Sequence, residues 1–329
     1  MLRLAHLITA ASLTITVGHR RLAAGGNRAC WSHELGAPGL AALQGYCPHV
    51  TRTLVRMSFL RHFICQFLRH YLLAVQFFTR IPITGRLAAW VGYSPAMLRA
   101  SAAHFPGVGW LVGALVAGLT WALLAVLPQS PYAPLVAAVL GTAAGVWITG
   151  AFHEDGLADV ADGLGGAMDR ERALLIMKDS RVGAFGALAL VLALLAKVAL
   201  LALIGSVSED AMCLGLFAAH VVSRALALVL VRAMPHVGND ANSKSKPLAD
   251  QISWGSLLAA FGWSFMALAL VQYTYNGINL IVPVLAGAMG MAWMWRLFWR
   301  RLQGFTGDCL GATQQVCELA FYLGLALAL

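Results

Sequence analysis

The sequence predicts an all-α, polytopic integral membrane protein with about seven transmembrane helices. Of its 329 residues, 60% are hydrophobic and 11% are charged, whereas a soluble domain carries about 25% charged residues. Mean hydropathy is +0.74, and the apolar residues gather in runs near the roughly 20 residues that cross a bilayer. A globule of this size cannot bury so much apolar surface, so the predicted surroundings are the lipid bilayer.

The first 56 residues differ from the rest of the chain. A short apolar run, 4–17, follows Arg3 as in a signal peptide. A stretch rich in Gly and Arg comes next, and this extension holds six Arg and one acidic residue, or +5 of the net charge of +9. Patterned sequence opens at Met57. We therefore expect residues 1–56 to be an extension from a mis-assigned start, with a true signal or anchor as the alternative, and 57–329 to be the membrane domain.

The segment 63–78 predicts an N-terminal amphipathic or partly inserted helix near the membrane interface. Pro82 resists continuation of the helix beyond this segment. The apolar pattern of the segment is interrupted by four polar residues: Gln66, Arg69, His70 and Gln76.

Seven apolar runs follow, and each is long enough to predict a membrane span. They are 108–127, 133–152, 183–205, 211–232, 254–271, 278–295 and 310–329. Four connectors carry Arg or Lys, namely 80–104, 153–182, 233–253 and 296–309. The connectors between them carry neither: 128–132, 206–210 and 272–277. This alternation places the basic connectors in the cytoplasm of a multi-pass protein of the bacterial inner membrane.

The connector 153–182 holds the most informative residues. It contains seven of the fourteen acidic residues: Glu154, Asp155, Asp159, Asp162, Asp169, Glu171 and Asp179. Carboxylates this dense repel one another unless a cation offsets their charge. In a helix, Asp155, Asp159 and Asp162 share one face at i, i+4 and i+7. We expect this face to bind Mg²⁺, with a solvated acidic loop as the alternative; the roles of His153 and Glu154 stay open.

Further polar groups lie on the same predicted side of the membrane. Lys178 and Arg181 are suited to neutralise phosphate oxygens, or they are cations that flank a span. Lys244 and Lys246 form a basic loop for which phosphate binding and simple solvation are equally favoured. Asp308 precedes the last run and is either a metal ligand or an acidic residue favoured by a helix dipole.

Charges inside the predicted spans are few, and the main ones are Lys197, Arg224 and Glu318. Placing the charged side chain of Glu318 in the bilayer costs free energy, which predicts a polar partner for it. The six cysteines form no CxxC pair and predict no zinc site or disulfide framework. Because the motif-like polar residues gather at one membrane face, the pattern favours an enzyme over a channel or transporter. Outside the extension the chain is only mildly basic, which does not suit a nucleic-acid binder.

Together these motifs resemble the cobalamin synthase family, the adenosylcobinamide-GDP ribazoletransferases, from about Met57 to the end of the chain. The matching residues are Phe78-Thr79-Arg80-Ile81-Pro82, Phe152-His153, Asp155-Gly156-Leu157-Ala158-Asp159, Asp162-Gly163, Ile176-Met177-Lys178-Asp179-Ser180-Arg181, Thr306-Gly307-Asp308 and Leu310-Gly311-Ala312. The loop 233–253 matches only loosely. The resemblance implies a membrane enzyme of the last steps of cobalamin biosynthesis. With Mg²⁺ it would join adenosylcobinamide-GDP to α-ribazole, or its 5′-phosphate, and release GMP.

For this reaction Asp155, Asp159 and Asp162 are the expected catalytic residues and, with Asp308, the expected metal ligands. Four cations are the expected ligands of the substrate phosphates: Lys178, Arg181, Lys244 and Lys246. Self-association into a homo-oligomer stays open.

Two alternatives belong to other classes. A CDP-alcohol phosphatidyltransferase also spaces aspartates on helices, but it would have an arginine after Ala158, where this chain has Asp159. A transporter or binding protein for cobamides would release no GMP.

Overall fold

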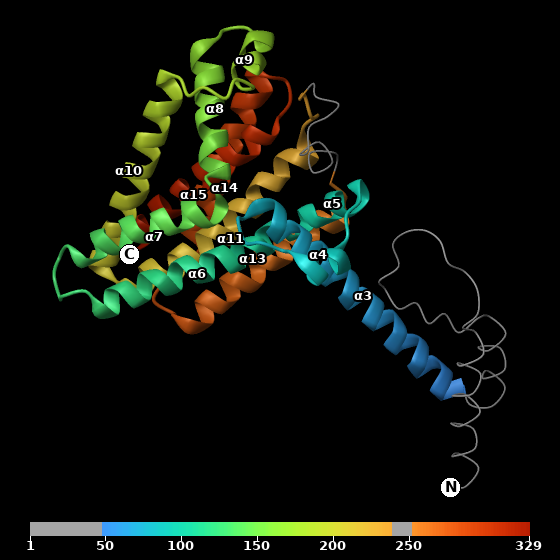
Figure 1. Ribbon diagram of the computed structural model, residues 1–329. Coiled ribbons are helices and arrows are strands. Elements are labelled where there is room, and N and C mark those ends of the chain that lie inside the picture. Colours follow the sequence, from blue (N-terminus) through green and yellow to red (C-terminus); the bar gives the residue numbers. More distant parts are fainter. Residues whose placement is uncertain (1–47, 239–251) are drawn as a thin grey trace. The chain divides into compact units, whose positions relative to one another are not determined.

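The computed structural model describes residues 48–238 and 252–329, which fold almost entirely into helices (Figure 1). The chain divides into two units, and the unit Arg52–Leu329 holds the bundle described below. Within the described residues, β pairing is limited to an isolated bridge between His236 and Phe305. The predicted all-α class is confirmed. The helices are α3 (Pro48–Phe78), α4 (Gly85–Val91), α5 (Pro95–Ser101), η1 (Ala102–His104), α6 (Phe105–Val126), α7 (Ala133–Thr149), α8 (Phe152–Gly166), α9 (Arg170–Ile176), α10 (Ala184–Val207), α11 (Glu209–Ala233), α13 (Trp254–Thr274), α14 (Ile281–Arg301) and α15 (Gly307–Ala328).

Each of the seven predicted spans is a helix, but two of them do not qualify alone as membrane crossings. Helix α7 has 17 residues, about 26 Å at 1.5 Å per residue, and qualifies only together with α8, across a bend of 89°. Helix α15 carries Gln314, Gln315 and Glu318 in its middle. The prediction of about seven spans is therefore reduced to five, or six with the bent pair. The five are Pro95–Val126, Ala184–Val207, Glu209–Ala233, Trp254–Thr274 and Ile281–Arg301.

The predicted N-terminal helix lies inside α3, which is longer than expected and ends at Phe78. Thr79 turns the chain there, because its hydroxyl donates to the Val75 carbonyl at 2.7 Å and accepts from the Ile81 amide at 3.1 Å. Whether α3 lies at the membrane interface stays a prediction. Most of the extension, residues 1–47, and the predicted basic loop with Lys244 and Lys246 lie outside the described residues.

Helix α11 lies at the centre of the bundle (Figure 1) and is buried along most of its length. Lipid is as apolar as leucine, so helices associate in a bilayer through close packing of small residues. Gly109 and Gly113 of α6 supply such a surface, because a Cβ at either position would meet the backbone of α11 at His220 or Phe217. Around the bundle, large apolar side chains are exposed, as lipid contact requires. Examples are Leu188, Leu192 and Leu195 on α10, Leu258 and Phe265 on α13, and Leu285, Met289 and Trp293 on α14.

The bend between α7 and α8 is built from two consecutive residues in the left-handed region. Gly150 has φ 71° and Ala151 has φ 60°, and a non-glycine residue adopts such a φ rarely. The Arg80 backbone amide donates to the Ile148 carbonyl at 2.7 Å, next to the bend. A Cβ at Gly150 would lie 2.6 Å from Arg80 Nε. The segment after α3 is thus packed against the turn that starts the acidic helix.

Helices α8 and α15 cross through two glycines. A Cβ at Gly156 of α8 would lie 2.7 Å from the backbone oxygen of Asp308, and one at Gly311 of α15 would lie 3.2 Å from the His153 carbonyl oxygen. The backbones therefore approach closely. This crossing sets the distance between the acidic helix and the start of α15.

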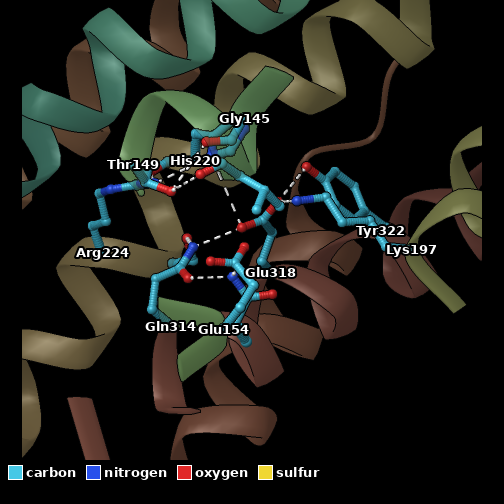
Figure 2. A network of polar contacts seen from close by, with 12 residues as sticks. Gly145, Thr149, Glu154, Lys197, His220, Arg224, Gln314, Glu318 and Tyr322 are labelled. Atoms are coloured by element: carbon cyan, nitrogen blue, oxygen red, sulfur yellow. Dashed lines mark hydrogen bonds and ion pairs between the residues drawn. The ribbon is translucent and has the colours of Figure 1, made fainter. Parts of the chain in front are cut away.

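A buried polar network lies inside the bundle (Figure 2). Lys197 of α10 pairs with Glu318 of α15 at 2.6 Å, and both side chains are almost fully buried. Tyr322 donates to Glu318 at 2.9 Å, and Gln314 donates to the other carboxylate oxygen at 2.6 Å. The predicted polar partner of Glu318 thus exists. A buried charge is tolerated when it is paired and its remaining lone pairs are satisfied.

The network reaches α8 and α11 as well. Gln315 donates to Glu154 at 3.1 Å and to the Gln314 side-chain oxygen at 3.0 Å. The Arg224 guanidinium of α11 lies 3.2 Å from Nδ1 of His220, and the same nitrogen lies 3.9 Å from the Glu318 carboxylate. The three charges that the sequence places in apolar surroundings therefore belong to one cluster that joins four helices.

We expect Lys197→Met to destabilise the fold by about 3–5 kcal/mol, because it leaves Glu318 buried without its ion-pair partner. Adding Glu318→Gln should recover much of that loss, since the amide keeps hydrogen-bonding capacity and carries no charge. Unfolding of the purified protein in detergent, followed by helical circular dichroism, gives the values. Strictly additive effects in this double-mutant cycle would contradict the pairing.

We expect Gly156→Ala to destabilise the fold by about 1–3 kcal/mol, because the added methyl forces α8 and α15 apart. Gly118→Ala in α6 is the matched control, since a Cβ there meets nothing within 4 Å and alanine is the better helix former. Thermal unfolding of both variants in the same detergent compares them. Equal stability of the two variants would show that the crossing tolerates a side chain.

Candidate functional site

The acidic stretch forms a helix, α8, as predicted. Its three aspartates differ in exposure: Asp155 is exposed, Asp159 is half-buried and Asp162 is buried. Asp155 lies in the first turn, where the helix dipole favours negative charge. The three aspartates therefore lie on one helix but differ in how far solvent reaches them.

Asp308 brings a fourth carboxylate from α15 to the same place. Thr306 caps α15 by accepting from the Cys309 amide, and its hydroxyl also donates to Asp308 at 3.2 Å. The carboxylates of Asp308, Asp155 and Asp162 all lie within electrostatic range of Asp159. Burial raises the pKa of Asp308 to about 6; the Thr306 hydrogen bond opposes this rise and the charge of Asp155 adds to it. We call Asp155, Asp159 and Asp308 the acidic face.

Asp162 has a further task in the structure. One of its carboxylate oxygens accepts from the Gly183 amide at 2.7 Å, and the other accepts from the Gly186 amide at 2.8 Å. These amides belong to the start of α10, whose first N–H groups have no partner within the helix. Asp162 thus ties α10 to α8, and its service as a metal ligand stays a prediction.

The two described cations of the predicted phosphate site lie on the loop between α9 and α10. Arg181 is exposed and forms a bidentate pair with Asp179, with Nε to Oδ1 at 3.0 Å. This hydrogen-bonded arginine lowers the pKa of Asp179 to about 2. Lys178 is also exposed. Because Asp162 holds the end of this loop at Gly183, both cations are tethered to the acidic helix.

The acidic face has the oxygen donors that Mg²⁺ prefers. Among the described residues, no three His, Cys, Asp or Glu side chains are arranged around a single metal position. Mg²⁺ is usually held by one or two carboxylates together with substrate phosphates and water, and seldom by an all-protein cage. The face therefore fits a metal that arrives with a phosphorylated ligand.

His153 and Glu154, whose roles the sequence left open, are both buried in the bundle. Glu154 is 8% exposed and accepts from Gln315, and His153 is 2% exposed. Their burial joins the start of α8 to the interior of the bundle.

An apolar cleft next to the acidic face was not predicted. Its lining comes from segments far apart in the chain, so no local sequence pattern indicated it. The lining residues, which we call the aromatic cleft, are Phe77, Phe78, Ala102, Phe105, Phe152, His153, Leu228, Gly307, Leu310 and Gly311. The close contact between Arg80 and the α7–α8 bend was not predicted either, although Arg80 belongs to the segment 78–82 that the sequence analysis singled out.

Comparison with known proteins places the chain in a family. A family model described as cobalamin-5-phosphate synthase matches residues 70–326. The adenosylcobinamide-GDP ribazoletransferase of Albidiferax ferrireducens is 67% identical over 278 residues, 80% of this chain and 99% of that protein. The protein of the same name from a Polaromonas species is 64% identical over 279 residues, 81% of this chain and 99% of its own length.

A more distant relative of the same name, from Leptothrix cholodnii, is 46% identical over 258 residues, 78% of this chain and 94% of that protein. No solved structure matches the chain significantly. The family model covers the acidic helix, the start of α15 and the buried network alike. This chain therefore belongs to the cobalamin-5-phosphate synthase family.

Proposed function

We propose that this chain joins adenosylcobinamide-GDP to α-ribazole, or to its 5′-phosphate, and releases GMP with the cobalamin product. The observation that carries the proposal is the convergence of Asp155 and Asp159 with Asp308, from helices brought together by a glycine crossing. Family membership supplies the substrates. Carboxylates gathered in this way suit a reaction at a diphosphate, where a metal ion and substrate together balance the charge.

Asp155, Asp159 and Asp308 would hold Mg²⁺ together with the diphosphate, with Asp162 at the far end of the helix. When bound, the metal would offset the charge that develops on the GMP leaving group. The attacking ribose hydroxyl must lose a proton, and we assign its acceptance to one carboxylate of this set. The helix termini at Thr306 and Ala151 fix the positions of these carboxylates before substrate binds.

Lys178 and Arg181 are the proposed ligands of the phosphate oxygens, together with Lys244 and Lys246. Arginine presents a planar fork that matches phosphate, and lysine presents a compact charge. The present bond of Arg181 to Asp179 keeps the guanidinium on the loop that Asp162 anchors. A diphosphate entering the site would compete with Asp179 for this arginine.

The proposed location is the bacterial inner membrane, with the acidic face toward the cytoplasm. The alternation of Arg and Lys among the connectors supports it, because the stretch with α8 and α9 and the end of α14 carry Arg or Lys and the short connectors carry neither. Bulky, charged substrates such as adenosylcobinamide-GDP are more easily supplied from the cytoplasm than through the bilayer.

We expect Asp155→Asn, Asp159→Asn and Asp308→Asn each to lower turnover by about 100-fold or more, because each removes charge that acts on the reacting phosphate. GMP release from the two substrates, measured over a series of Mg²⁺ concentrations, is the assay. Asp210→Asn is the matched control, an exposed acid in the first turn of α11. Near-normal rates in the first three variants would refute the acidic face as the reaction site.

We expect Arg172→Cys and Arg300→Cys to react with a membrane-impermeant thiol reagent only after the cytoplasmic side is opened. Ser130→Cys and Ser206→Cys should react in intact cells with a permeable outer membrane. A background without the native cysteines is needed, since the chain has six. Reaction of the first pair from outside the inner membrane would reverse the proposed orientation.

A further inference from the structure

The aromatic cleft is made of rings from three parts of the chain. Phe78 at the end of α3 lies 4.2 Å, centroid to centroid, from Phe105 at the start of α6. Phe105 stacks on His153 of α8 at 5.7 Å with an interplanar angle of 19°. Phe77 and Phe78 both meet Phe152 edge-on at 5.9 Å. Such a lining favours a flat aromatic ligand.

His153 gives this apolar cleft its one polar side chain among the ten lining residues. The residue is 2% exposed, and its Nε2 atom has no hydrogen-bond partner among the described residues. Buried polar atoms nearly always have a partner, so an orphaned one calls for an explanation. A ligand with a single polar atom facing Nε2 would supply it.

The cleft adjoins the acidic face through two shared segments. Phe152 and His153 lie in the first turn of α8, immediately before Asp155. Gly307 and Leu310 flank Asp308 in the first turn of α15. A molecule with its ring in the cleft would therefore carry its attached sugar toward the carboxylates.

Resting on the proposed function, we infer that the aromatic cleft binds the base of α-ribazole and that His153 recognises its unsubstituted ring nitrogen. This base is a dimethylated benzimidazole, a flat two-ring system with apolar edges and one ring nitrogen available as an acceptor. The guanine of the other substrate has several donors and acceptors, and most would stay unpaired among phenylalanines at a cost in free energy. The cleft therefore fits the ribazole base better than the nucleotide.

The cleft is narrow, so binding of the base requires movement of its side chains. The cleft has a volume of about 40 Å³, which is room for a few water molecules at about 10–15 Å³ each and too little for a two-ring base unless the lining moves. The base therefore enters as rings at the rim move, and Phe152 is 38% exposed. Rotamer changes of this kind are common on binding.

The first test compares apparent KM values for the two substrates in the full-length protein. We expect Phe105→Leu, and Ala102→Leu, which narrows the cleft, to raise the KM for α-ribazole by about tenfold. The KM for adenosylcobinamide-GDP should change less than about twofold. Phe321→Leu is the matched control, a fully buried phenylalanine of α15 that does not line the cleft. A selective rise in the other KM, or no change in either, would overturn the assignment.

The second test isolates His153. His153→Phe keeps a ring and removes the hydrogen bond, so the KM for α-ribazole should rise by about five- to tenfold. His153→Gln keeps a donor and should recover part of the loss, which a merely structural role would not produce. Equal effects of the two variants on both KM values would count against recognition by His153.

Direct binding separates failure of this inference from failure of the proposed function. α-Ribazole is titrated with protein while its intrinsic fluorescence is recorded. We expect the fluorescence to change on addition of wild type or Phe321→Leu, and to change far less on addition of Phe105→Leu. Excess GMP should not displace the bound α-ribazole. Displacement by GMP would assign the cleft to guanine and overturn the inference. A wild-type protein that binds α-ribazole yet releases no GMP would refute the proposed function and leave the cleft assignment standing.

Discussion

The close crossing of α8 and α15 is the constraint on which the site depends. Gly156 and Gly311 let the two backbones meet, and no side chain of larger size fits at Gly156 without displacing Asp308. The same contact brings Asp308 within range of Asp159 on one side and Gln315 within hydrogen-bond distance of Glu154 on the other. One pair of glycines thereby sets both the acidic face and the attachment of the acidic helix to the bundle.

The buried network holds this crossing in place from within the bundle. Removing a charge from water costs several kcal/mol per ion, and only good pairing offsets that cost. Glu318 meets the condition with Lys197, Tyr322 and Gln314 around it. Since Lys197 lies on α10, whose start is bound by Asp162, the helix is fixed at its end and at its middle. The aspartates of α8 are therefore presented by a rigid frame.

Much of this could be predicted from the sequence, and the rest depends on contacts between distant segments. The spacing of Asp155, Asp159 and Asp162 indicated a helix, and the cost of Glu318 in apolar surroundings indicated a partner. The sequence did not reveal that Asp162 binds the start of α10, because that requires α10 to begin beside α8. Nor did it reveal the bend at Ala151, whose left-handed φ no alanine prefers. Seven spans are also not confirmed, since α7 is short and bends into α8 and α15 carries polar residues in its middle.

The order of the chain gives the Lys197–Glu318 pair a consequence for biogenesis. Lys197 is synthesised and inserted with α10, whereas Glu318 emerges near the end of translation. Until α15 docks, the Lys197 ammonium group lacks its ion-pair partner Glu318, and α8 lacks both Asp308 and Gln315. Docking of the last helix neutralises that charge and completes the acidic face in the same event. A chain truncated before α15 would therefore leave Lys197 buried without its ion-pair partner.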